Sequence, residues 1–275
     1  MAPLQTPDTA PTPPSHSVPP IHLRVLDVSH PGTELFFLAT STPGEALRTA
    51  AQRVLSTLYP SDLTSSSSSS PATPPPVRSV TLHLRAFDGV AHTCGSDLDN
   101  DHKELHLSSS YLASVAMNCG GKLDDIKHEI EGVLVHELVH AFQWDGKGTV
   151  PGGVIEGIAD WVRDQVGLGA LHWRENPQED DKWDAGYSTT AYFLRWLASH
   201  FKNPHLAPQL NLAMRNHKWD GGEHLKKLCN GKDIEELWEI YRKEVKKKED
   251  AGEDVEEPPQ PVPTHGVRSG YAVQY

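Results

Sequence analysis

The sequence predicts an α+β fold, in which an N-terminal mixed β-sheet packs against a C-terminal part built from helices. Three observations support this class. Segments that alternate apolar and polar residues come first, apolar residues at helical spacing dominate after Asp124, and no linker separates the two regions. We therefore expect one domain over residues 21–248 rather than two smaller ones.

The first elements are strands with one helix between them. Ile21 to Val28 and Ser79 to Ala86 alternate apolar and polar side chains, which is typical of a strand with one buried face. Glu104 to Leu107 is predicted as a short third strand. Directly after Pro43, the segment Gly44 to Leu58 carries apolar residues at helical spacing and is expected to form a helix.

The later elements are helices. From Asp124 an apolar stripe predicts a long helix, whose buried face would consist of Ile126, Ile130, Val133, Leu134, Leu138 and Phe142. Three more helices are expected at Val154–Val166, Ser188–His200 and Asp233–Lys247. Asp233 and Glu236 resemble a capping pair at the start of the last helix.

Three segments are predicted to lie outside the packed core of the domain. Residues 1–20 form a disordered Pro-rich leader, residues 61–78 a Ser/Pro-rich loop, and residues 249–275 an acidic Pro-rich tail. The leader lacks a basic patch followed by an apolar core, which a conventional secretion signal requires. A cytoplasmic location is therefore favoured.

Composition narrows the classes of partner. The formal net charge of −12 would repel nucleic acid and anionic membranes, so neither is an expected partner. No apolar run approaches the roughly 20 residues that a membrane helix needs. The three cysteines are sparse and odd in number, which favours reduced thiols; a Cys94–Cys119 bridge is the alternative. The pattern predicts no particular oligomeric state.

The central motif is His136-Glu137-Leu138-Val139-His140, within the predicted long helix. Positions four apart share one face of an α-helix, so both imidazoles can point at one ion. Glu137 lies about 100° around the helix. There it misses the ion but reaches a water beside it, as a general base must. The alternative is a pair of histidines on a surface helix face, which the motif alone does not exclude.

The third ligand decides between these interpretations, because a catalytic zinc takes three protein ligands and one water. The extended pattern HExxHxxGxxH is excluded, since Gln143 and Gly146 occupy its glycine and histidine positions. Pro151-Gly152-Gly153 breaks the chain before a new helix, which carries two acids four residues apart. We predict Glu156 as the third ligand and Asp160 as the acceptor of an N–H from a ligating histidine. Both acids facing solvent is the alternative.

Zinc is the predicted ion, one per chain, because two imidazoles and one carboxylate suit its tetrahedral coordination. A bound water would then have a pKa near 7 and attack a peptide carbonyl. The resulting oxyanion would need a nearby donor. The sequence therefore predicts hydrolysis of peptide bonds in a peptide or protein substrate.

One block of the sequence also resembles a known family. The segment GVLVHELVHAFQWDGKGTVPGGVIEGIADWVR, Gly132 to Arg163, closely resembles the basic secretory protein family, also described as a peptidase family of plants and bacteria. The resemblance implies a zincin-like metallopeptidase over about residues 21–245. It implies the same zinc ligands and base, namely His136, His140, Glu156 and Glu137. The family is named for basic, exported members, whereas this chain is acidic.

Two functional alternatives stay open at this point. One is a non-catalytic zinc-containing binding or defence-related protein of the same fold. Glu137 argues against it, because a purely structural site has no use for a general base. The other is hydrolysis of a non-peptide amide or ester by the same site.

Several further residues are weighed as parts of the site. Tyr187 opens a predicted helix and is a candidate oxyanion donor, although a ring packed in the core with its hydroxyl satisfied is the alternative. His172 is a second candidate donor, but a structural role beside Trp173 is the simpler expectation. Helix termination and packing would account for Gln143 and Trp144. His106 and His128 are expected at the surface, and the 104–107 strand is expected to bind extended peptide through its edge.

Overall fold

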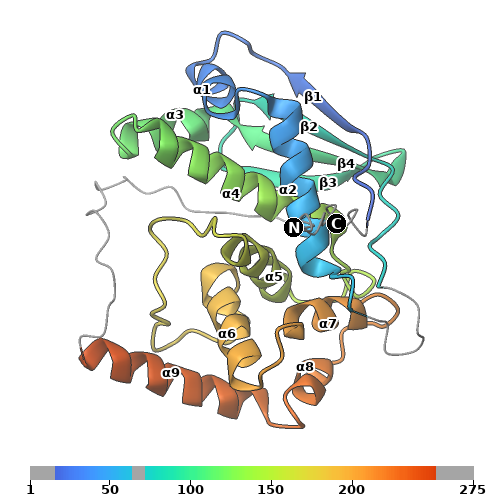
Figure 1. Cartoon of the computed structure of the whole chain (residues 1–275), viewed down its shortest axis with the longest axis vertical. Helices are drawn as coiled ribbons and strands as arrows, with labels where there is room; N and C mark the ends of the chain where they lie inside the picture. The colour runs from blue at the N-terminus through green and yellow to red at the C-terminus, as the bar shows by residue number, and fades with distance from the viewer. Residues whose placement is uncertain (1–15, 64–71, 252–275) are drawn as a thin grey trace, which may run out of the picture.

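The computed structural model describes residues 16–63 and 72–251. Within these ranges the chain forms four strands and nine helices, so the predicted α+β class is confirmed. The sheet and helices α1 to α4 make up one half of the molecule, and helices α5 to α9 make up the other (Figure 1). The predicted leader, the Ser65–Ser70 run and the acidic tail lie wholly or mostly outside the described residues.

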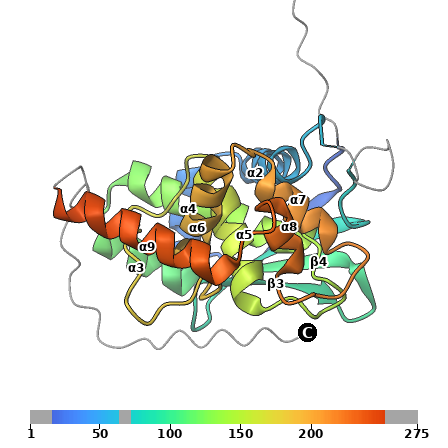
Figure 2. The same ribbon diagram turned by 90° about the horizontal axis from the view of Figure 1, so that it is seen from below.

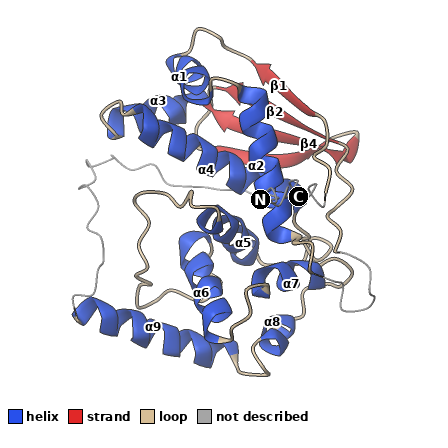
Figure 3. Cartoon of the chain, in the orientation of Figure 1, coloured by secondary structure: helices blue, strands red, loops and turns tan. Residues whose placement is uncertain are grey.

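The four strands form one mixed sheet with the order β1-β2-β4-β3. The sheet is drawn in red in Figure 3. Strand β1 (Ile21–Val25) pairs parallel with β2 (Ser79–Arg85), and β2 pairs parallel with β4 (Asp99–Ser108). Strand β3 (Ala91–Ser96) pairs antiparallel with β4. The predicted mixed sheet is therefore confirmed. The first strand is three residues shorter than expected, and the strand expected at 104–107 is ten residues long.

The expectation that the 104–107 strand offers a free edge was wrong. It belongs to β4, which has hydrogen-bonded neighbours on both sides, so its backbone groups are already paired. The edges of the sheet are β1 and β3. Strand β3 was not predicted because its sequence AHTCGS contains no alternation of large apolar residues.

Four helices belong to the half of the molecule that contains the sheet. They are α1 (Pro31–Thr40), α2 (Pro43–Leu58), α3 (Ser109–Asn118) and α4 (Leu123–Phe142). Helices α2, α3 and α4 contact the strands directly, and their apolar faces bury Leu82, Leu84, Leu105 and Leu107 of the sheet. Helices α2 and α4 agree with the sequence, whereas α1 and α3 were not predicted.

The other half contains five helices, with α9 packed across α6 (Figure 2). They are α5 (Gly152–Gln165), α6 (Tyr187–His200), α7 (Leu206–Ala213), α8 (Glu223–Leu228) and α9 (Ile234–Asp250). Three were expected from the sequence, and α7 and α8 were not. Asp233 caps α9 as predicted, since its side chain accepts from the N–H groups of Glu235 and Glu236.

A buried hydrogen-bond network joins the two halves near the end of α4. The Tyr59 hydroxyl donates to the carbonyl of Phe142 at 2.6 Å and accepts from the Asn211 amide at 3.0 Å. Asn211 in turn accepts from the backbone N–H of Trp144 at 2.9 Å. Because these groups satisfy the helix end in the core, the last turn of α4 is held in a fixed position.

Two further sequence expectations concern the whole chain. Cys94, Cys119 and Cys229 are all free thiols, and Cys94 and Cys119 do not form a bridge. Within residues 16–63 and 72–251, none of the helices combines the length and apolar character needed to traverse a bilayer.

Candidate metal centre

Helix α4 presents the two motif histidines because its other face is buried. Ile126, Ile130, Leu134, Leu138 and Phe142 are each at most 2% exposed, and Val133 is 4% exposed. This is the stripe expected from the sequence. With that stripe packed in the core, the histidines four residues apart face α5, which packs against α4.

The structure brings His136, His140 and Glu156 together. His136 Nε2 lies 3.1 Å from His140 Nε2 and 3.0 Å from Glu156 Oε2. The third separation, from His140 Nε2 to Glu156 Oε2, is 3.6 Å. All three side chains are largely buried, at 12–15% exposure. The residues come from two successive helices, as the sequence predicts.

These separations fit the ligand set of a single zinc ion. Ligands at about 2.0–2.1 Å from a tetrahedral zinc are separated from one another by about 3.3 Å, and the three observed separations lie on either side of that value. Two imidazole nitrogens aimed at each other need a shared proton or a cation between them. The donor types, two imidazoles and one carboxylate, also suit zinc.

The electrostatics of the group favour a positive charge. Burial alone would lower the pKa of His136, but the charge of Asp160 and hydrogen bonds with Asp160 and Glu156 raise it above the ordinary histidine value. Burial would likewise raise the pKa of Glu156, yet its contacts with His136 and His140 hold it well below its usual range. A cation placed among these side chains would therefore be stabilised.

Asp160 contacts His136 at Nδ1, the ring nitrogen on the side away from Glu156 and His140. His136 Nδ1 donates to Asp160 Oδ1 at 2.6 Å, and Asp160 is only 2% exposed. This bond fixes one proton on Nδ1, so in a neutral His136 the lone pair of Nε2 would be directed at Glu156 and His140, where a cation can accept it. Glu156 and Asp160 stand one turn apart on α5, so the same helix supplies one candidate ligand and the hydrogen-bond partner of another.

Gln143 contacts the Nδ1 atom of His140, as Asp160 contacts the Nδ1 atom of His136. From the sequence, Gln143 was expected to serve only helix termination and packing. Its amide lies 2.7 Å from His140 Nδ1, and its Oε1 is buried without a hydrogen-bond partner. A ligating His140 carries its proton on Nδ1 and needs an acceptor there. Rotating the amide by 180° supplies Oε1 for that purpose. The sequence signal that was available is the i, i+3 spacing of His140 and Gln143, which lie in the last turn of α4 and at its C-cap.

Glu137 lies on the side of α4 that faces the sheet edge. It is 6% exposed, and the hydroxyl of Thr93 on β3 donates to its Oε2 at 2.8 Å. The same hydroxyl lies 3.0 Å from the backbone carbonyl of Glu137. Strand β3 thus fixes the orientation of this carboxylate. Thr93 could not be identified from the sequence, because the strand that carries it was not predicted.

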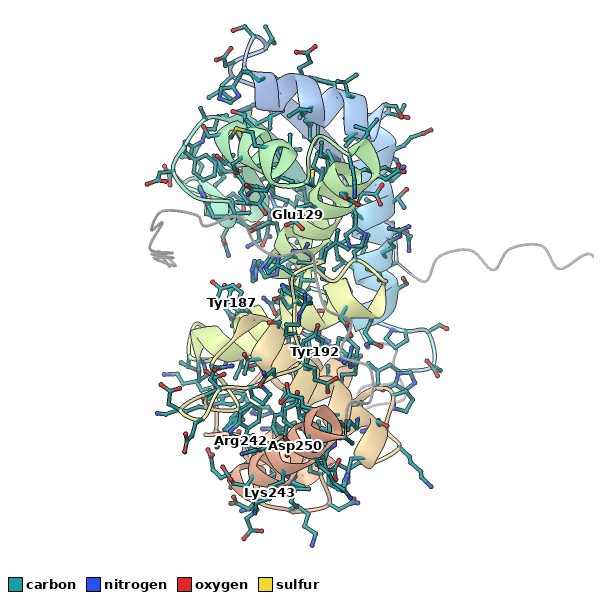
Figure 4. The ribbon with its side chains drawn as sticks, turned by 90° about the vertical axis from the view of Figure 1, so that its left-hand side faces the viewer. Glu129, Tyr187, Tyr192, Arg242, Lys243 and Asp250 are labelled. Carbon is teal, nitrogen blue, oxygen red and sulfur yellow. The ribbon has the colours of Figure 1, made fainter. Side chains whose placement is uncertain are left out.

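Tyr187 is placed beside the histidines by an unusual turn. Its ring is parallel to that of His136, with the ring centres 6.3 Å apart. The backbone of Tyr187 has φ of 48°, a conformation costly for a bulky residue, and it follows Gly186 with φ of 100°. Figure 4 shows Tyr187 at the level where the two halves of the molecule meet. The turn therefore brings the first residue of α6 to the metal-ligand group.

Three histidines outside this group, which were also weighed from the sequence, differ in how far they are exposed to solvent. His172, the second candidate donor, is exposed. The expectation that His106 and His128 lie at the surface was wrong, because both are partly buried. The His106 side chain is 14% exposed within the sheet, and His128 Nε2 makes a 2.8 Å hydrogen bond with the carbonyl of Gly169. His128 lies between Lys127 and Glu129, and His106 alternates with Leu105 and Leu107, so the sequence pattern placed both histidines on exposed faces.

Comparison with known proteins gives one result. A family model described as "Peptidase of plants and bacteria" matches residues 18–241, which is most of the chain. Neither curated proteins nor solved structures show a significant match. The matched range includes the four strands, the helices α4 and α5 that carry His136, His140 and Glu156, and the first eight residues of α9. This chain therefore belongs to the family of plant and bacterial peptidases, as the resemblance of its central block predicted.

Proposed function

We propose that this chain is a zinc-dependent peptidase, with one zinc ion held by His136, His140 and Glu156. The observation that carries the proposal is the mutual approach of these three donors at 3.0–3.6 Å. Membership in a peptidase family supports a peptide or protein as substrate. When bound, the metal supplies a Lewis acid that acidifies a water and polarises the scissile carbonyl.

Glu137 is the proposed general base. It takes the proton from the attacking water and passes it to the leaving amine, so a single carboxylate serves both halves of the reaction. Its burial and its bond from Thr93 keep it in one orientation. The same features argue against a non-catalytic binding protein, because a structural metal site would not need a positioned carboxylate next to its ligands.

The other proposed site residues orient the histidine ligands, stabilise the oxyanion or dock the substrate. Asp160 keeps His136 in the ligating tautomer, and Gln143 is placed to do so for His140. Tyr187 is the proposed donor to the developing oxyanion, which its place beside His136 and its strained backbone support. The edge of β3 beside Glu137 is the proposed docking edge for an extended substrate, in place of the 104–107 strand.

The decisive experiment compares the wild type with Glu137→Gln. We expect one zinc per chain in both proteins, with peptide hydrolysis in the variant reduced at least about 100-fold because the general base is removed. Glu131→Gln is the matched control on α4, since Glu131 pairs with Arg53 and Lys127 in the described part of the chain and not with the candidate site. It should keep both zinc and activity.

Each contrary result has a distinct meaning. Equal activity of Glu137→Gln and the wild type would remove Glu137 as the base. Zinc binding with no hydrolysis of any peptide in a broad library, even by the wild type, would favour the binding-protein alternative. A wild-type protein that is active after exhaustive metal removal would refute the metal-dependent mechanism.

A further inference from the structure

A second cluster of side chains of the types that bind metals lies on the sheet face opposite the buried leucines. In β2, Leu82 and Leu84 point into the core, so His83 between them points to the opposite face. His83 is in register with His106 of β4, which is in register with His92 of β3. The three rings stack in a row, with neighbouring ring centres 4.6 Å apart.

Two histidines of this row, His83 and His106, converge with Glu104 of β4. Oε2 of Glu104 lies 3.8 Å from His83 Nε2 and 3.6 Å from His106 Nε2. The ligand atoms of the three residues all lie within 4.8 Å of one another. These distances are too long for hydrogen bonds. They are only somewhat longer than the separation of about 3.3 Å between the ligands of a tetrahedral zinc.

The Nε2 atom of His83 provides independent evidence that this site binds a ligand. His83 is 9% exposed, and its Nε2 is buried without a hydrogen-bond partner. A buried polar atom without a partner is costly, so its persistence needs an explanation. Because this nitrogen faces Glu104 at a distance no hydrogen bond spans, a group that contacts both would remove the cost.

The protonation state suits a metal. Burial lowers the pKa of His83 even though Glu104 is close. Burial and the neighbouring His92 also lower the pKa of His106, to about 4. Both rings are therefore neutral at pH 7, and a metal ion need not displace a proton from either.

Arg85 opposes metal binding. Its Nε donates to His106 Nδ1 at 3.0 Å, so the single proton of this neutral ring resides on Nε2. For Nε2 to ligate a metal, the proton must move to Nδ1 and Arg85 must leave. Arg24, in register with His83, adds a second positive charge to this face. Any metal here is therefore held less tightly than at the centre between α4 and α5.

We propose that His83, Glu104 and His106 form a second, weaker site for a divalent metal ion of the zinc class, controlled by Arg85. Two imidazoles and a carboxylate are the donors that zinc and its neighbours in the first transition row accept. The site lies on the opposite face of the sheet from α4 and does not depend on the proposed peptidase activity.

The test counts bound zinc in the full chain. After equilibrium dialysis against excess ZnCl2, we expect two zinc ions per wild-type chain by mass spectrometry, the weaker one removed first by a graded chelator. The double variant His83→Gln/His106→Gln should retain one zinc and the peptidase activity of the wild type. His22→Gln is the matched control, an exposed histidine on β1 beside Arg24, and should retain two.

Arg85→Gln tests the control of the site. The glutamine oxygen can accept from Nδ1 of His106, which favours the ligating tautomer, so we expect the second zinc to bind at least about tenfold more tightly. One zinc per wild-type chain, or two in the double variant, would overturn the proposal. Weaker or unchanged binding of the second zinc in Arg85→Gln would also overturn it, because His106 Nε2 would then not be a ligand.

Discussion

Thr93 on the edge strand β3 donates a hydrogen bond of 2.8 Å to the carboxylate of Glu137 on α4. This bond joins the sheet edge, where we propose that substrate docks, to the proposed general base. It also makes Glu137 dependent on a strand that is remote in sequence. The orientation of the base is therefore a property of the assembled fold rather than of the motif helix alone.

Replacing Thr93 should impair hydrolysis without affecting the metal. A hydrogen bond to a charged group contributes about 1.5–3 kcal/mol. For Thr93→Val we therefore expect kcat/KM for a peptide to fall about 10- to 100-fold, with the zinc content unchanged. Thr93→Ser keeps the hydroxyl and should retain most of the activity. A valine variant as active as the serine variant would show that the bond does not assist the reaction.

Replacing Asp160 should weaken metal binding. Asp160→Asn removes the carboxylate that fixes the His136 tautomer, and the loss of such a partner costs about 10- to 100-fold in metal affinity. Competition with a chromogenic chelator measures this change. Asp164→Asn is the control one turn further along α5, since Asp164 pairs with Arg195 instead. Similar losses in both variants would mean that the effect comes from α5 as a whole.

Replacing Gly153 should displace the turn that carries Tyr187. A Cβ on Gly153 would lie 1.8 Å from the carbonyl oxygen of Asp184, so either α5 or the turn must move. We expect Gly153→Ala to lower both Tm and kcat. Gly152→Ala is the control, because a Cβ there meets no atom within 4 Å. Wild-type kcat in Gly153→Ala would argue against a catalytic role for the position of Tyr187.

The buried pair between Arg163 and Glu129 should matter more for stability than a surface pair. Arg163 Nη2 lies 2.8 Å from Glu129 Oε2, and the two side chains are 7% and 14% exposed. Glu129→Gln leaves a buried charge without its partner and should lower the free energy of unfolding by about 3–5 kcal/mol. Urea unfolding measures this loss.

The comparison for that pair is Arg242 with Glu239 on α9, and Figure 4 shows Arg242 in the other half of the molecule from Glu129. Glu239 is 54% exposed, so Glu239→Gln should change the free energy of unfolding by at most about 1 kcal/mol. Equal effects of the two glutamine variants would contradict the assignment of the α4–α5 pair as buried and structurally important.

The sequence predicted the elements with a strong periodic signal. Strand β2, helix α4 and the helix that carries Glu156 were found because their apolar residues repeat at the period of their secondary structure. Strand β3 and helix α3 were missed, since their local sequences lack such a pattern and their packing depends on neighbours far along the chain.

The same distinction holds at the candidate site. His136, His140 and Glu156 were named from spacing along helices, and the fold brings them together. Thr93 was not named, because its contact with Glu137 spans 44 residues of sequence. Gln143 was dismissed for a different reason. Its spacing from His140 is visible in the sequence, but the direction of its amide becomes evident only when the buried end of α4 is known.

The three donors of the proposed metal centre come from opposite halves of the molecule. His136 and His140 belong to the half that contains the sheet, whereas Glu156 belongs to the half formed by the later helices (Figure 1). Any ion held by all three is a crosslink across this seam. Its removal would release α5 from α4 at that point, so hydrogen exchange should accelerate along the seam before the core of either half opens.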